Sequence, residues 1–154
     1  MPFIADIEKI KMGVDKAYTN FAGAQCAALV QNVPLLGGGT VPHTTTWRRG
    51  AKVKDLAWDE IAEGTVIATF TEEGLYPLER RHTAIYLSHD KNSILVIDQY
   101  VDRPYAKVRP LPFRGGTTRA VDNGDFYWVV ETSLSLAGEV AKQPFYALMR
   151  SIRF

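Results

Sequence analysis

The sequence contains only one cysteine, and this scarcity excludes two common ways of stabilising a small protein. A single cysteine cannot form an internal disulfide, and the usual structural zinc sites need several cysteines. The fold must therefore be held by an apolar core. A chain of 154 residues with 46% hydrophobic residues is large enough to bury one. We expect a single domain over residues 1–154, with neither a metal nor an organic cofactor.

An excess of charge and long apolar runs are also missing. The formal net charge of +1 gives no overall field that would attract nucleic acid or a membrane surface. No stretch approaches the roughly 20 apolar residues of a membrane span. Residues 1–10 carry acidic side chains where a signal peptide carries basic ones. We expect a protein made in the cytoplasm without a signal peptide, with no nucleic-acid partner and no membrane span, whose secretion would use a leaderless route.

The apolar pattern changes from helical to strand-like along the chain. Isoleucines at near-helical spacing predict a helix over residues 4–12, and a second helix begins at Cys26 and ends before Pro34. Helices followed by strands indicate an α+β fold with an antiparallel sheet. Runs of β-branched and aromatic residues predict strands at 65–70, 82–88, 94–100, 106–109 and 126–130, with 145–149 as a closing strand or helical turn.

A glycine- and threonine-rich stretch, residues 36–46, separates the helices from the strands. It lacks the Lys-Ser/Thr ending of a phosphate-binding loop, so we exclude a nucleotide site there. The stretch is either a substrate-facing loop or a plain connector. Trp47, which ends it, is a core anchor or the wall of a groove.

Cys26 lies at the start of the second predicted helix, and this position bears on its reactivity. The unpaired backbone N–H groups of a helix N-terminus stabilise an anion, so a thiol there ionises more readily. A free cysteine followed by the apolar residues 27–30 is, however, also typical of a small buried core residue. The residues around Cys26 alone are compatible with both interpretations.

A base and a group that could orient it lie on two neighbouring predicted strands. His82 begins one strand, and Asp98 and Gln99 end the next. An odd turn after His89, for instance residues 90–92, puts Asp98 on the face of His82, whereas an even turn puts Gln99 there. Either side chain can accept an imidazole N–H. Asp98 interrupts an apolar strand, which favours a buried carboxylate with a partner.

Taken in order, the motifs between Gly23 and Arg109 form a recognisable set. They are Gly23-x-Gln25-Cys26-x-Ala28-Leu29-Val30, Thr46-Trp47-x-x-Gly50, residues 64–70, Gly74-x-Tyr76-Pro77, residues 82–86 and residues 96–100. This set resembles small cysteine amidohydrolases of the NlpC and CHAP types. The likeness is closest to the amidase-like effectors of bacterial type VI secretion.

The resemblance implies a papain-like fold, in which N-terminal helices precede a nucleophile helix packed on an antiparallel sheet. It implies that the family's substrates are peptidoglycan stem peptides, cut at an amide bond through a thioester without a metal, and that an immunity protein is a possible partner. The site residues it implies are Cys26 as nucleophile, His82 as base and Asp98 as orienting group, with Gln25, Trp47 and Gln99 as candidates for oxyanion or substrate binding.

Two other functions remain compatible with the same residues. A descendant without catalytic activity could bind cell-wall fragments or a protein partner in the same groove. An acyltransferase could use the same thioester but deliver the acyl group to an acceptor other than water. The basic stretch after residue 102 is either a solvated strand edge or a binding surface for the carboxylates of an acidic stem peptide; it contains Arg103, Lys107, Arg109, Arg114 and Arg119.

Overall fold

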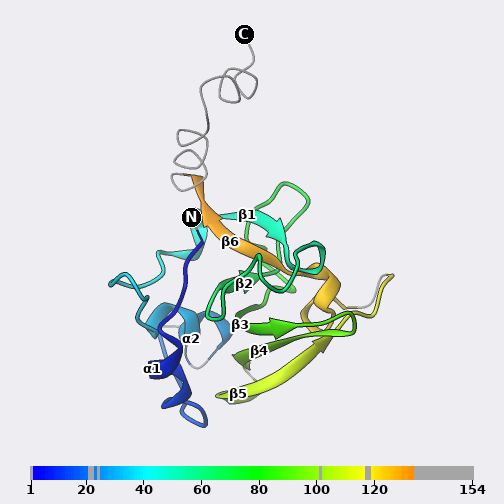
Figure 1. Ribbon diagram of the computed structural model, residues 1–154. Coiled ribbons are helices and arrows are strands. Elements are labelled where there is room, and N and C mark those ends of the chain that lie inside the picture. Colours follow the sequence, from blue (N-terminus) through cyan, green and yellow to red (C-terminus); the bar gives the residue numbers. More distant parts are fainter. Residues whose placement is uncertain (1, 21–22, 24, 101, 117–118, 134–154) are drawn as a thin grey trace, which may run out of the picture.

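A six-stranded antiparallel sheet forms the centre of the computed structural model, which describes residues 2–20, 23, 25–100, 102–116 and 119–133 (Figure 1). The spatial order of the strands is β1-β6-β2-β3-β4-β5. The strands are β1 (Trp47–Lys52), β2 (Val66–Ala68), β3 (Thr83–His89), β4 (Ser93–Tyr100), β5 (Arg103–Pro112) and β6 (Trp128–Thr132). The helices are α1 (Ile7–Lys11) and α2 (Cys26–Asn32), with short 3-10 turns η1 (Thr44–Thr46), η2 (Val53–Asp55), η3 (Ala120–Asp122) and η4 (Gly124–Phe126). The predicted α+β class with an antiparallel sheet is confirmed.

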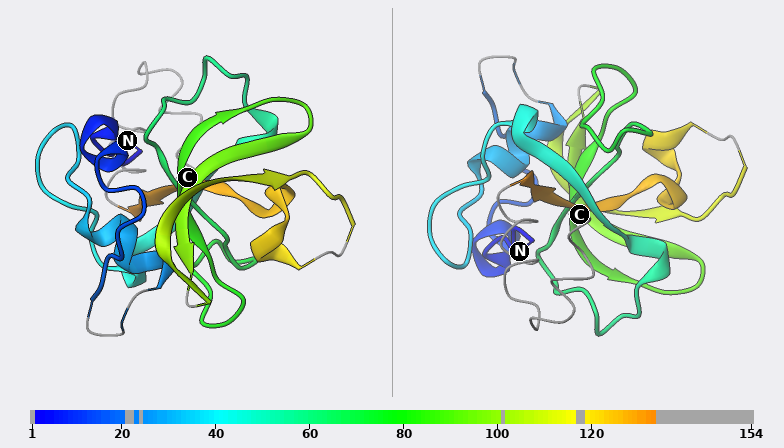
Figure 2. Two further views of the ribbon diagram at one scale, coloured as in Figure 1. Left: turned by 90° about the horizontal axis from the view of Figure 1, so that it is seen from below. Right: turned by 90° about the horizontal axis from the view of Figure 1, so that it is seen from above.

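The two faces of the sheet carry separate apolar clusters, because consecutive residues of a strand point to opposite sides. On one face, Leu29 and Val30 of α2 pack with Ile85 of β3 and Ile97 of β4. The cluster on the opposite face includes Val53, Ile67, Ala84, Tyr86, Val96, Leu111 and Tyr127. Figure 2 shows the segment with α1 and α2 (blue) on one side of the sheet and the segment with η3 and η4 (gold) on the other.

Helix α1 is shorter than the predicted helix over residues 4–12. Asp6 caps its N-terminus by accepting the backbone N–H of Lys9. The residues before Asp6 are extended instead, because Ile4 forms a β-bridge with Thr65 and Ala5 forms one with Leu35. These bridges tie the N-terminal segment to the sheet, so tertiary pairing outweighs helical periodicity here.

Gly64 lets the N-terminal segment lie close to the residues just before β2. Its φ is +98°, and a Cβ there would lie 2.6 Å from the carbonyl oxygen of Ala5. We expect Gly64→Ala to lower the free energy of unfolding by more than about 1 kcal/mol, measured by urea denaturation. Gly37→Ala is the matched control, because a Cβ at Gly37 meets nothing within 4 Å. Equal losses in the two variants would contradict this assignment.

The remaining differences from the predicted strands are largest at the two edges of the sheet; in its interior, β2 is shorter than the expected 65–70. Strand β1 was not predicted, and β5 is longer than the expected 106–109. Both are edge strands. Strand β6 begins two residues later than the expected 126–130, after the 3-10 turn η4. The predicted segment 145–149 lies outside the described residues. Within the described ranges, no helix is both long enough and apolar enough to cross a membrane.

Candidate active site

Cys26 is the first residue of α2, and its side chain is almost fully buried next to the start of β3. Only 3% of the residue is exposed. Its Sγ lies 3.7 Å from the hydroxyl oxygen of Tyr76. Helix α2 packs on β3 and β4, so the helix start brings the thiol to the point where β3 begins.

The surroundings of Cys26 favour the thiolate. Burial raises the pKa of the thiol, but the His82 imidazole, the backbone N–H of Thr83 and the Tyr76 hydroxyl lower it, and the net pKa lies below the ordinary value. The Nδ1 atom of His82 is buried and has no hydrogen-bond partner among the described residues. The thiol and the imidazole therefore shift each other's pKa through both hydrogen bonding and charge, and Nδ1 is the ring nitrogen that Asp98 does not use.

His82, directly before β3, is held by hydrogen bonds of both its backbone and its ring. Its backbone N–H donates to the Thr69 hydroxyl at 3.0 Å, and its carbonyl accepts the Thr69 N–H at 3.0 Å. The ring Nε2 lies 2.6 Å from Oδ2 of Asp98. Burial lowers the pKa of His82, but Asp98 and Cys26 raise it, and the net pKa lies above the ordinary value. Because Nε2 donates its proton to the carboxylate, the neutral ring presents Nδ1 as an acceptor.

Asp98 is fully buried and receives donors from three side chains. Besides His82, Arg103 donates from Nη2 to Oδ1 at 2.6 Å, and Arg109 donates from Nε to Oδ2 at 2.7 Å. Burial raises the pKa of Asp98, but the contacts with His82, Arg109 and Arg103 lower it further than burial raises it. The carboxylate is therefore ionised at neutral pH, where it orients the imidazole and stabilises its positive form.

A β-bulge decides that Asp98 rather than Gln99 faces His82. The Asp90 N–H donates to the Ser93 carbonyl, so the turn holds two residues, which is the even one of the two alternatives. An even turn alone would have put Gln99 on that face. Between Tyr86 and Ser88 the register shifts by one, so that Ile85 lies opposite Ile97 and Asp98 returns to the His82 side. Of the two alternatives left open by the sequence, the structure thus has Asp98 beside His82, through a bulge that neither alternative included.

Gln99 points to the opposite face, where it supports the start of α2. It is fully buried, and its amide donates to the carbonyls of Tyr18 and Gln25 at 2.6 Å and 2.8 Å. Its carbonyl accepts the Tyr18 N–H at 3.1 Å. The expectation that Gln99 contacts substrate or His82 is therefore corrected: it fixes the residue that precedes Cys26.

Trp47 and Gln25 differ in their access to solvent. Trp47 is fully buried, its indole N–H donates to the Pro42 carbonyl, and its ring packs edge-on against Tyr76 with centroids 4.8 Å apart. It is a core anchor and does not line the site, which corrects the expectation of a substrate contact. Gln25 lines a cavity together with Cys26, Leu78, Arg80, Arg81 and Tyr100.

Comparison with known proteins identifies the family of the chain. The family model described as domesticated amidase effector 2 matches residues 8–130. The chain belongs to this family. The matched segment includes Cys26, His82 and Asp98.

Two relatives of the chain are informative. The type VI secretion amidase effector 2 protein of Salmonella typhi is 29% identical, with 85% of this chain and 100% of the relative aligned. The solved structure of type 6 secretion amidase effector 2 (Tae2) is 27% identical and superposes with a TM-score of 0.66 over 85% of this chain and 95% of that one. The resemblance to amidase-like type VI effectors inferred from the motifs is confirmed.

The contacts that three residues make at the site were not predicted from the sequence. Tyr76 was part of a motif only, and Arg103 and Arg109 were members of the basic stretch. Arg109 lies opposite Val96 in the β4–β5 ladder, one position diagonal to Asp98. That pairing could have been anticipated from a hairpin with few residues between β4 and β5. Tyr76 had no comparable signal, because a loop places it.

Proposed function

We propose that the chain is a cysteine amidase with a papain-like arrangement that hydrolyses an amide bond in peptidoglycan stem peptides. One observation carries the proposal. The buried His82 is bound through Nε2 to an ionised carboxylate, its other nitrogen has no hydrogen-bond partner among the described residues, and the ring and the chain's one thiol shift each other's pKa. This combination supports proton transfer from sulfur to imidazole. The relatives' names, which describe amidase effectors, support the reaction class.

The proposed reaction has two halves. The Cys26 thiolate attacks the amide carbonyl carbon, and the resulting oxyanion collapses as the C–N bond breaks and the His82 imidazolium protonates the leaving nitrogen. This leaves a thioester and a free amine. Water then loses a proton to His82 and attacks the thioester, which releases a carboxylate and restores the thiolate. Asp98 stays ionised throughout and stabilises the imidazolium.

Tyr76 is a candidate donor to the oxyanion in this mechanism. Burial raises the pKa of its hydroxyl well above the ordinary value, and the nearby Cys26 raises it further, so the group stays protonated. The Tyr76 hydroxyl oxygen lies 3.7 Å from the Cys26 Sγ. A carbonyl carbon attacked by Sγ would therefore carry its oxygen close to this hydroxyl. The Cys26 backbone N–H and the Gln25 side chain are the other candidate donors.

Digestion of purified sacculi tests the proposed function. Because the chain has one cysteine, protein pre-treated with iodoacetamide differs from active protein at Cys26 alone and is the matched control. The untreated protein should produce new muropeptides, each cleavage adding one free amine and one free carboxyl group. Identical muropeptide profiles with both samples would overturn the proposal. Products that carry an amine added to the buffer would identify acyl transfer instead.

The relatives' names also support a proposal about where the protein acts. Both are described as secretion amidase effectors. We propose that this chain is likewise delivered by such a route to the wall of another cell. A bacterium that makes a wall-degrading effector has to protect its own wall, so an immunity protein that blocks the site is the expected partner.

A further inference from the structure

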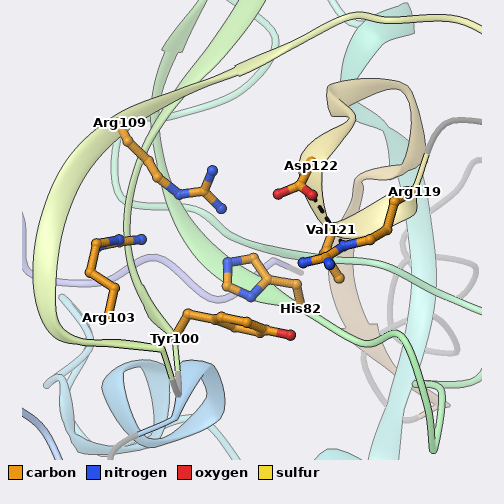
Figure 3. A pocket seen from close by; sticks show the side chains of 7 residues that line it. All are labelled: His82, Tyr100, Arg103, Arg109, Arg119, Val121 and Asp122. Carbon is orange, nitrogen blue, oxygen red and sulfur yellow. Dashed lines mark ion pairs between the residues drawn. The ribbon is translucent and has the colours of Figure 1, made fainter.

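A cavity lined by His82 lies next to the cavity lined by Cys26, and Tyr100 borders both. The cavity at His82 has a volume of about 170 Å³. Figure 3 shows Arg103 and Arg109 entering it from the side of β5, and Arg119 from the side of η3. We call it the arginine cavity; its lining is His82, Tyr100, Arg103, Arg109, Arg119, Val121 and Asp122.

The arginine cavity has an excess of positive charge. Three guanidinium groups line it, and they pair with two carboxylates, the buried Asp98 and the more exposed Asp122. Because Arg103 and Arg109 share Asp98, the three positive charges exceed the two negative charges by one, in a space partly shielded from water. Such a site favours an anion over a neutral group.

The cavity also has hydrogen-bond donors to offer an anion. Arg109 uses its Nε on Asp98, and within the described part of the chain its two terminal nitrogens make no hydrogen bond. Arg119 pairs through Nε with Asp122 at 3.1 Å, and its terminal nitrogens likewise bind no described residue. In Figure 3 the two side chains approach from opposite sides. Two guanidinium groups in this arrangement can hold one carboxylate between them.

The other basic residues of this stretch have different roles. Lys107 pairs with Asp15 on the N-terminal segment. Arg114 donates from Nε to the backbone carbonyl of Asp122 at 3.0 Å, which holds the chain that carries Arg119. The basic stretch is therefore neither a uniformly solvated edge nor a uniform binding surface. Three of its members, Arg103, Arg109 and Arg119, line the cavity.

We propose that the arginine cavity binds a carboxylate carried by the amine part of the substrate, the part that leaves in the first half of the reaction. The inference rests on the proposed function. His82 has to hand its proton to the leaving nitrogen, so the leaving group lies on the His82 side of the scissile bond. The cavity shares His82 and lies beside that position. The acyl part of the substrate remains on the side of Gln25 and Arg81, next to Cys26.

Two exposed residues allow a test with opposite expected signs. Arg119→Gln removes a donor, whereas Asp122→Asn releases Arg119 from its present partner. The probes are soluble muropeptides in two pools, one untreated and one with carboxyl groups converted to amides by carbodiimide and ammonia. On the untreated pool we expect Arg119→Gln to raise KM about tenfold with little change in kcat, and Asp122→Asn to lower KM about twofold to fivefold. On the amidated pool neither variant should differ from wild type.

A control and a binding measurement separate the possible failures. Arg48→Gln, on β1 at the opposite edge of the sheet from β5, should behave as wild type on both pools. Calorimetric titration of the Cys26→Ala protein with each pool reports carboxylate binding without turnover. Absence of cleavage by wild type would overturn the proposed function. Cleavage with equal KM on both pools, or an Arg119→Gln effect of equal size on both, would overturn the carboxylate site alone. Binding that does not distinguish the pools would overturn it as well.

Discussion

The His82→Ala variant is expected to lose about 10³-fold to 10⁴-fold in kcat/KM on peptidoglycan, because the general base and the proton donor to the leaving amine are the same ring. No other imidazole can substitute. His43 lies on the loop before β1 with its Nδ1 bonded to the Thr45 hydroxyl, and His89 is held between the Tyr86 hydroxyl and the Leu56 carbonyl. The loss should be in kcat and not in KM.

The same variant should change the pH at which Cys26 reacts with iodoacetamide. In wild type the pKa of Cys26 lies below the ordinary value, so the thiolate persists at pH values where an ordinary thiol is protonated. At pH 6 an ordinary thiol is only about 0.3% ionised. Without His82 the largest of the interactions that lower the pKa are lost while burial still raises it, so the midpoint of alkylation should move to higher pH than in wild type.

Two measurements keep this prediction decisive. The exposed His43→Ala is the matched control, and its alkylation profile should coincide with that of wild type. The thermal midpoint of His82→Ala shows that the variant is folded when it is assayed. An alkylation profile that is indifferent to His82 would mean that Cys26 is an ordinary core residue.

The Asp98→Asn variant is expected to lose about 3–5 kcal/mol in free energy of unfolding, together with most of the activity. The carboxylate is the shared partner of His82, Arg103 and Arg109, and an amide leaves two guanidinium groups without a counter-charge. The amide also cannot stabilise the imidazolium, so kcat should fall by about 10³-fold or more.

The direction in which the stability loss of Asp98→Asn changes with pH can also be predicted. The pKa of Asp98 in the folded protein lies below its ordinary value of 3.8, so its contribution is present above that value and is lost as the pH falls through the lowered pKa. The difference between wild type and Asp98→Asn in urea denaturation should therefore be largest near neutral pH and shrink in acid. Asp15→Asn, whose partner Lys107 is largely exposed, is the control and should show no measurable loss. A difference independent of pH would contradict the ionised state assigned to Asp98.

The elements around the site could be predicted from the sequence because they are buried and therefore consist mainly of apolar and β-branched residues. The start of α2 at Cys26 follows from an apolar run with a proline behind it, and β3 and β4 from runs of β-branched residues. The juxtaposition of His82 and Asp98 followed from strand parity once a register was assumed. That register depended on a bulge, and nothing in the sequence around Leu87 marks it.

The elements that could not be predicted are those stabilised by their neighbours. Strand β1 reads Trp-Arg-Arg-Gly-Ala-Lys and lacks alternating apolar residues, because it is an edge strand anchored chiefly by the buried Trp47. A Cβ at Gly50 would lie 2.8 Å from the Val129 carbonyl oxygen, so the close pairing with β6 requires glycine there. Tyr76 reaches the thiol from a loop, and no periodic pattern places a loop side chain.

The bulge at Leu87 separates the tip of the β3–β4 hairpin from the alignment of His82 with Asp98. On the tip side, His89 lies opposite Ile94, whereas on the site side Ile85 lies opposite Ile97. The latter two side chains are locked by the core under α2. Insertions at Lys91 and Asn92 lengthen the hairpin away from that locked pair. The tip is therefore the natural place for length variation among homologues and for grafting an epitope or a fluorescent label onto an active protein.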